Sequence, residues 1–86
     1  MEIVFSLRAK EEFLKFDNSM KLLFRKSFNK MLENPVRRHL KYGIPYHVEN
    51  VTKQARIIYE LKEDKIIILH CFSEHKEYEK WYNSYK

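Results

Sequence analysis

Apolar residues recur at helical spacing along the first third of the chain. Residues 2–6 form a short β-rich start, in which Ser6 can cap a following helix through its side-chain oxygen. Apolar positions in residues 7–16 then follow the three-to-four-residue period of a helix, and a second such stripe occupies a basic segment at 20–31. The pattern predicts a strand followed by two helices.

Helix-breaking residues separate and end these two helices. The Asp-Asn-Ser run at 17–19 interrupts the first stripe and supplies a cap for the second helix. Asn34 precedes Pro35, and a residue before proline disfavours the α region, which ends the second helix. Because the connection between the helices is so short, we expect an antiparallel helical hairpin.

The second half of the chain changes to the two-residue period of strands. A turn at 42–45 contains the sole glycine and a proline, and residues 46–51 follow it as a strand. Side chains alternate over 55–61, with Ile57, Tyr59 and Leu61 on one face and Arg56, Ile58 and Glu60 on the other. This alternation predicts a strand with two distinct faces.

A charged turn at 62–65 connects this strand to the next one. Residues 66–72 are apolar almost throughout, which is typical of a central strand covered on both faces. If the first and last residues of the turn pair with each other, Cys71 lies opposite Arg56, and a slip of one residue changes that pairing. Cys71 itself is expected to be a small core residue.

The chain ends in an amphipathic segment at 74–85, whose aromatic residues are three or four positions apart. The predicted order is therefore β-α-α-β-β-β-α in one domain spanning residues 1–86. One helical layer on an antiparallel sheet is the natural solution for such an order. We expect an α+β fold with an N-terminal strand, an antiparallel helical hairpin packed on a small four-stranded, mainly antiparallel sheet, and a C-terminal helix.

Composition narrows the class of protein. Of the 86 residues, 34% are charged and 44% are hydrophobic, which suits a single small globular domain. The longest apolar run, 66–69, is far too short to span a bilayer, and the N-terminus lacks the pattern of a signal peptide. The single cysteine excludes an internal disulfide, so we expect a cytoplasmic protein. The net charge of +5 favours polyanionic partners.

Three segments between residues 34 and 82 carry a resemblance to a known family. They are NPVRRHLKYGIPYHVEN, ARIIYELKEDKIIILHCF and HKEYEKWY. With the predicted element order, they resemble the RelE/ParE superfamily of toxins from type II toxin–antitoxin systems. RelE-like members are ribosome-dependent endoribonucleases that cut mRNA in the ribosomal A site, whereas ParE-like members share the fold and poison DNA gyrase without cutting RNA. The fold therefore does not decide the function, and the site residues must.

Metal-free RNA cleavage by a 2′-hydroxyl needs a proton acceptor, cations that stabilise the charged phosphate, and an acid for the leaving oxygen. Arg56 matches the strand arginine that contacts the phosphate in the family. The family also carries basic catalytic residues after the last strand, which implies His75 as an acid or base and Lys76 as a phosphate ligand. Tyr78 resembles the tyrosine that stacks on the mRNA base or aids catalysis. A gapless alignment from Arg56 places Tyr82 there instead.

A second set of residues is predicted to bind RNA. Arg37, Arg38 and Lys41 form a basic cluster that can contact RNA phosphates without reading sequence. His47 lies where some RelE-like members have an active-site lysine, and Glu49 replaces a second lysine of those members. This replacement argues against a lysine-based mechanism and leaves a histidine or glutamate base, as in the YoeB-like branch.

The same residues also have purely structural interpretations. Arg56 can pair with Glu49 or Glu60, the basic cluster can be a solvated loop, and the aromatic stripe can pack on the sheet, foremost through Trp81. His70, Cys71 and His75 are residue types that bind metals, but neighbours on a strand point to opposite faces and zinc needs four ligands. We therefore expect no metal and no cofactor.

The sequence as a whole favours one function over two others. We expect a toxin that cleaves mRNA in the ribosomal A site by 2′-hydroxyl attack on the phosphate. The resemblance implies a cognate antitoxin, the ribosome and mRNA as partners, a toxin–antitoxin hetero-oligomer and no membrane association. The alternatives are a ParE-like gyrase poison, which is an interaction protein rather than an enzyme, and a non-catalytic basic module that binds RNA.

Overall fold

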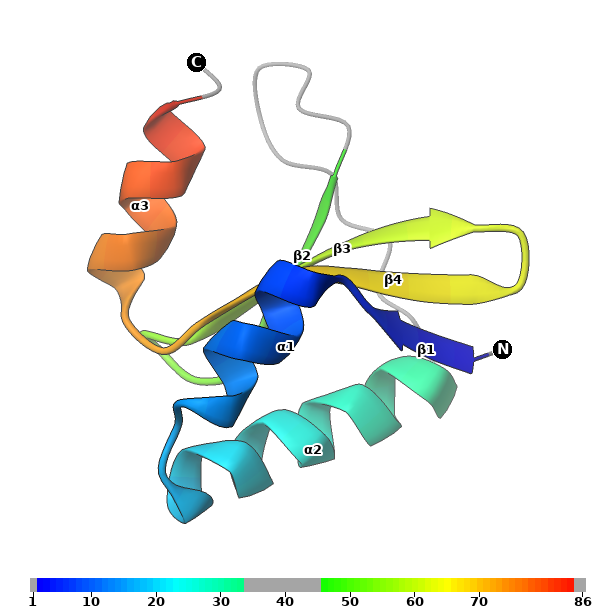
Figure 1. The fold of residues 1–86 in the computed structure, drawn as a ribbon, viewed down its shortest axis with the longest axis horizontal. Coiled ribbons are helices and arrows are strands. Elements are labelled where there is room, and N and C mark those ends of the chain that lie inside the picture. The colour runs from blue at the N-terminus through cyan, green and yellow to red at the C-terminus, as the bar shows by residue number, and fades with distance from the viewer. Residues whose placement is uncertain (1, 34–45, 85–86) are drawn as a thin grey trace.

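The computed structural model describes residues 2–33 and 46–84 (Figure 1). The elements are β1 (Glu2–Phe5), α1 (Leu7–Leu14), α2 (Asn18–Glu33), β2 (His47–Asn50), β3 (Arg56–Lys62), β4 (Lys65–Phe72) and α3 (His75–Asn83). Their order is the predicted one. The Ser6 hydroxyl accepts the Ala9 N–H at 3.1 Å, so Ser6 caps α1 as expected.

The four strands form one mixed sheet in the order β1-β4-β3-β2. Strand β1 pairs in parallel with β4, whereas β3 pairs in antiparallel with both β4 and β2. The α+β class and the mainly antiparallel four-stranded sheet predicted from the sequence are therefore confirmed. None of the helices in the described ranges is long and apolar enough to cross a membrane.

A bulge in β4 changes the predicted strand register. Lys62 pairs with Lys65 across the hairpin, but the pairing shifts between Tyr59, opposite Ile68, and its neighbour Ile58, opposite His70. Leu69 is the extra residue, and a residue inserted in one strand offsets every later pair. Beyond the bulge, Cys71 lies opposite Ile57 and Arg56 lies opposite Phe72. The expectation that Cys71 faces Arg56 is therefore wrong, because it assumed an unbroken ladder.

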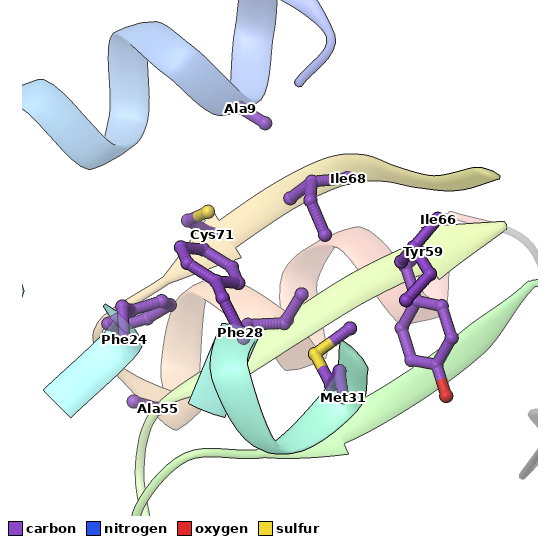
Figure 2. Packing of buried hydrophobic residues seen from close by; sticks show 10 residues of the cluster. Ala9, Phe24, Phe28, Met31, Ala55, Tyr59, Ile66, Ile68 and Cys71 are labelled. Atoms are coloured by element: carbon purple, nitrogen blue, oxygen red, sulfur yellow. The ribbon is translucent and has the colours of Figure 1, made fainter. Parts of the chain in front are cut away.

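The main hydrophobic core lies between the helical hairpin and one face of the sheet. Phe24, Phe28 and Met31 of α2 pack against alternate side chains of β3 and β4 (Figure 2). The buried members are Ala9, Phe24, Phe28, Met31, Ala55, Ile57, Tyr59, Ile66, Ile68 and Cys71. The predicted inward face of β3 and the core placement of Cys71 are both confirmed.

A smaller apolar cluster occupies the opposite face of the sheet, under α3. It is built on the buried side chains of Val48, Ile58 and Phe72, with Trp81 and the tyrosines of α3 packed against them. The structural interpretation of Trp81 is therefore correct. Because β3 alternates its side chains, Arg56 shares this α3 face with Ile58 rather than the face that carries the helical hairpin.

Glu12 of α1 connects the hairpin to β4 just after the bulge. Its Oε1 accepts the Cys71 N–H at 2.9 Å, and its Oε2 lies 3.2 Å from His70 Nδ1. Strand β1 pairs with β4 only as far as Ile68, so the carboxylate takes the place that a further strand residue would occupy. This contact satisfies a backbone donor that the bulged edge would otherwise leave open.

Burial of Cys71 predicts a pH-dependent loss of stability. Desolvation, aided by the charge on Glu12, raises the pKa of Cys71 from its ordinary 9.0 to about 12. The unfolded thiol ionises first, so the stabilisation is complete below pH 9 and is lost as the pH rises towards 12, by about 1.4 kcal/mol per pH unit at most. Urea denaturation at a series of pH values should show this fall in wild type and a flatter profile in Cys71→Ala. If the stability of both proteins falls equally with pH, the assigned role of Cys71 is contradicted.

Candidate functional site

Arg56 stands at the start of β3, where the turn before it fixes its guanidinium group. One guanidinium nitrogen donates to the carbonyl oxygens of Thr52 and Ala55 at 2.9 and 3.0 Å. The Thr52 hydroxyl in turn accepts the Ala55 N–H at 2.9 Å, which closes the turn. The half-buried guanidinium is therefore held in place by backbone acceptors that leave its charge unneutralised.

The alternative ion pairs for Arg56 are not present. Glu49 lies on the opposite face of the sheet, where it pairs with Lys30 of α2 at 3.8 Å. Within residues 2–33 and 46–84, neither Glu49, Glu60 nor any other carboxylate forms an ion pair with Arg56. Its fork of N–H donors is thus directed at an environment without an anion, which suits a phosphate ligand.

Tyr78 of α3 is the aromatic partner of Arg56. The guanidinium carbon lies 5.7 Å from the centre of the tyrosine ring, within the range of a cation–π contact. Burial raises the pKa of the Tyr78 hydroxyl, the neighbouring Tyr82 raises it further, and Arg56 acts in the opposite direction. The hydroxyl therefore stays protonated at neutral pH and can donate a hydrogen bond.

His75 extends this cluster along α3. Its ring centre is 5.6 Å from that of Tyr78, and its Nδ1 lies 2.6 Å from Glu79 Oε1 one helical turn later. When Nδ1 carries the proton shared with Glu79, Nε2 is the atom that can accept or release a proton. Glu79 was missed in the sequence analysis, although its four-residue spacing from His75 is the signal that would have found it.

Arg56, Tyr78, His75 and Glu79 thus form one continuous cluster, called here the arginine–tyrosine cluster. Tyr82 borders it, because its ring centre lies 5.9 Å from that of Tyr78. The cation–π contact with Arg56 belongs to Tyr78. This geometry favours Tyr78 over Tyr82 as the aromatic residue nearest a phosphate bound by Arg56.

Other predicted site residues do not join the arginine–tyrosine cluster. Lys76 is exposed on α3, and residues two apart on a helix point in different directions. His47 is buried and stacks on Tyr59 at 5.3 Å, on the face of the sheet that carries the helical hairpin. The remaining RNA-binding predictions lie outside the described residues; they are Arg37, Arg38 and Lys41.

The described part of the chain offers no metal site. Nowhere in residues 2–33 and 46–84 do three or more histidine, cysteine, aspartate or glutamate side chains gather in a way that could hold a metal ion.

Comparisons with known proteins give similarity in structure but not in sequence. No protein-family model matches the chain, and no curated protein is similar to it in sequence. A YoeB/ParE toxin from Agrobacterium tumefaciens superposes with a TM-score of 0.71 at 13% identity, over 84% of this chain and 96% of that one. The isolated E. coli RelE toxin superposes with a TM-score of 0.70 at 15% identity, over 95% of both chains.

A toxin–antitoxin complex is also among the similar structures. The heterotetrameric YoeB-YefM complex from Staphylococcus aureus matches with a TM-score of 0.68 at 20% identity, over 84% of this chain and 94% of that one. Nearly the whole length of each of these solved chains is matched. The chain therefore has the RelE/ParE-like toxin fold, which confirms the fold that the sequence resemblance implied.

Proposed function

We propose that this chain, which has the RelE/ParE-like fold and carries an arginine–tyrosine cluster on its α3 face, is the toxin of a toxin–antitoxin pair. Its activity is ribosome-dependent cleavage of mRNA in the A site. The observation that carries the proposal is the Arg56 guanidinium, which is held by two backbone carbonyls, has no carboxylate partner among the described residues and lies over the ring of Tyr78. Fold similarity alone would not separate this activity from gyrase poisoning.

The cluster contains the parts that 2′-hydroxyl attack requires. Arg56 binds the scissile phosphate and stabilises the additional charge of the transition state. His75, oriented by Glu79, takes the proton from the 2′-hydroxyl or gives one to the leaving 5′-oxygen. The new bond joins the 2′-oxygen to phosphorus while the bond to the 5′-oxygen breaks, which yields a cyclic phosphate and a 5′-hydroxyl end. Tyr78 stacks on the neighbouring base or donates its hydroxyl proton in a hydrogen bond.

The wider RNA contacts of the proposal involve the basic residues around the cluster. Lys76 on the exposed side of α3 contacts a phosphate of the mRNA or of ribosomal RNA. Arg37, Arg38 and Lys41 contribute further phosphate contacts, and Tyr82 remains a predicted RNA-binding residue, whereas the buried His47 has no part in the proposed RNA contacts. Such contacts position a protein without reading sequence, in keeping with the net charge of +5.

An antitoxin is the second partner that we infer. The similar structures include the RelBE and YoeB-YefM toxin–antitoxin complexes. This chain exposes leucines on the outer surfaces of its helical hairpin, among them Leu7, Leu14 and Leu22, on a basic molecule. An acidic, amphipathic antitoxin chain that forms a hetero-oligomer with it in the cytoplasm would suit both features.

The two tyrosines of α3 should differ in their contribution to cleavage. Tyr78→Ala removes the ring under Arg56 and should lower the cleavage rate by about 10- to 100-fold, the loss expected for one base-stacking contact. Tyr82→Ala should have a smaller effect, because its ring touches Tyr78 rather than Arg56. Single-turnover cleavage on purified ribosomes measures both, with thermal denaturation as the check on folding. A larger loss in Tyr82→Ala would move the functional role to that residue.

The experiment that tests the function is controlled expression of the chain in bacteria. The proposal predicts growth arrest together with new 5′ ends inside translated mRNA codons, while plasmid supercoiling stays unchanged. Arrest with altered supercoiling and intact mRNA would instead indicate a gyrase poison. If the folded protein does not arrest growth, the remaining interpretation is a non-catalytic module that binds RNA.

A further inference from the structure

A second group of functional side chains lies on the other flank of α3. There α1, the end of β4 and α3 border an open groove of about 350 Å³, called here the α1–α3 groove. Its lining includes Arg8, Glu12, His70, Phe72, Lys80 and Trp81. None of Arg56, His75 and Tyr78 lines this groove, although Trp81 adjoins Tyr78, with ring centres 6.4 Å apart.

Aromatic rings form the apolar wall of the α1–α3 groove. The rings of His70 and Phe72 are stacked, with centres 4.9 Å apart and planes inclined by 13°. Trp81 lies 5.6 Å from His70 and 6.2 Å from Phe72. The plane of Trp81 is inclined by 57° to that of His70 and by 47° to that of Phe72, and exposed aromatic faces bind other planar rings, nucleobases in particular, by stacking.

The two acidic side chains of the groove are already engaged. Glu12 accepts the Cys71 N–H with one oxygen and contacts His70 with the other. Glu77 accepts a hydrogen bond from the backbone N–H of Glu74, within the capping box of α3. Neither carboxylate forms an ion pair with Arg8 or Lys80 among the residues that the structure describes.

The two cationic side chains of the groove are not engaged in this way. Arg8 and Lys80 are exposed, and neither forms an ion pair with any residue that the structure describes. They come from α1 and α3, the two helices that border the groove. An anion between the two helices would therefore meet positive charge from both.

We propose that the α1–α3 groove binds a nucleotide, with the base against the His70–Phe72–Trp81 wall and the phosphate between Arg8 and Lys80. The combination of an aromatic wall with two cations that form no ion pair among the described residues matches a ligand that is both planar and anionic. His70 reads the base edge through Nε2, since Nδ1 is engaged with Glu12. The groove volume lies at the lower end of the range usual for small-ligand sites, which suits one nucleotide.

The nucleotide has two chemical sources, a single-stranded RNA or a free nucleoside monophosphate. The RNA source rests on the proposed function, since an enzyme that holds mRNA at the arginine–tyrosine cluster gains a second anchoring point across α3. The site itself does not depend on catalysis. Binding can therefore be measured without ribosomes and in a variant that cannot cleave.

The single tryptophan of the chain reports directly on the groove, because Trp81 is part of its wall. We expect a short oligoadenylate to quench Trp81 fluorescence saturably, and adding salt should weaken the binding. The double variant Arg8→Gln/Lys80→Gln should bind oligoadenylate at least about tenfold more weakly than wild type does. This is the loss expected when charge-assisted phosphate contacts are removed. The double variant Lys10→Gln/Lys26→Gln has the same net charge but alters exposed residues outside the groove lining, so it should bind nearly as wild type does.

Three comparisons make the result specific. If adenosine monophosphate binds as tightly as oligoadenylate, a free nucleotide is identified as the ligand. A strong preference for the oligomer identifies RNA instead. Arg56→Ala should keep the dependence on Arg8 and Lys80, although Trp81 lies on the same helix as Tyr78. Equal weakening by both double variants would overturn the proposal, and so would quenching by an acidic peptide but by neither nucleotide ligand.

The same comparisons separate this proposal from the proposed function. If the protein binds nucleotide in the groove but cuts no mRNA on ribosomes, the nucleotide site is supported and the proposed nuclease activity is contradicted. If the protein cleaves mRNA on ribosomes but no nucleotide ligand quenches Trp81 fluorescence, the nuclease activity is supported and the groove site is contradicted.

Discussion

Arg56→Ala should lower ribosome-dependent mRNA cleavage by about 10²- to 10³-fold, the loss typical of removing one group that stabilises the charge of a transition state. The effect is expected to be large because the guanidinium has no carboxylate partner among the described residues and is held by the carbonyls of Thr52 and Ala55. A charge fixed in this way needs no reorganisation when the phosphate becomes more negative. The measurement is the single-turnover cleavage rate on purified ribosomes.

Two further variants show whether the charge or its geometry matters. Arg56→Lys keeps the charge but loses the planar fork, so it should recover only a small part of the rate. Lys53→Ala removes an exposed cation from the same turn and should cleave nearly as fast as wild type. Wild-type cleavage by a folded Arg56→Ala protein would contradict the assigned role.

Phe24→Ala should destabilise the fold by about 3–5 kcal/mol, the range for truncating a fully buried phenylalanine. Phe24 has no exposed surface, and its ring contacts Phe16 at 4.9 Å, Phe28 at 6.2 Å and Phe13 at 6.4 Å between centres. It therefore joins α1, α2 and the sheet at one point of the core (Figure 2). A loss of this size is a large fraction of the stability of a domain of 86 residues.

Urea denaturation measures this prediction, with Leu22→Ala on the same helix as the matched control. Leu22 is 51% exposed, so its truncation should cost less than about 1 kcal/mol. Similar losses in the two variants would show that the hairpin does not pack on the sheet as described. The comparison also tests the fold independently of any activity.

Side-chain periodicity was sufficient to predict the elements and the hairpin layer, but the expected single helical layer is wrong, because α3 covers the opposite face of the sheet. The alternation around Ile57 and Tyr59 placed Arg56 on the opposite face from the core, and the helical stripes of α1 and α2 predicted the hairpin that covers that core. Both features follow from local spacing and from burial of the apolar face. The single parallel pairing, β1 with β4, also agrees with a sheet that is mainly antiparallel.

The details of the site depended on contacts that local spacing does not determine. The bulge at Leu69 arises where Glu12, distant in sequence, takes over the bonding of β4 after β1 ends. The hydrogen bond from the Arg56 guanidinium to the Thr52 carbonyl depends on the conformation of one turn. His47 was expected near the RNA, but its pairing with Tyr59 places it on the hairpin face. Each of these outcomes is set by tertiary packing.

The aromatic side chains of α3 form one continuous stripe, because the rings of Tyr78 and Trp81 lie 6.4 Å apart. Tyr78 and His75 border Arg56, whereas Trp81 and Lys80 border the α1–α3 groove. A helix that presents aromatic and charged groups on both flanks suits a protein that contacts an extended polyanion. Substitutions of Arg8 and Lys80 leave Arg56 and Tyr78 in place, which is why variants of the two sites are informative together.

Cleavage of mRNA on purified ribosomes, with the A site either empty or filled by tRNA, tests the central claim most directly. The account predicts that wild-type protein cuts the A-site codon when the site is empty and leaves a 5′-hydroxyl end. It predicts little cutting when tRNA fills the site or when ribosomes are left out. Intact mRNA in every reaction with folded protein, or equal cutting with and without ribosomes, would contradict it.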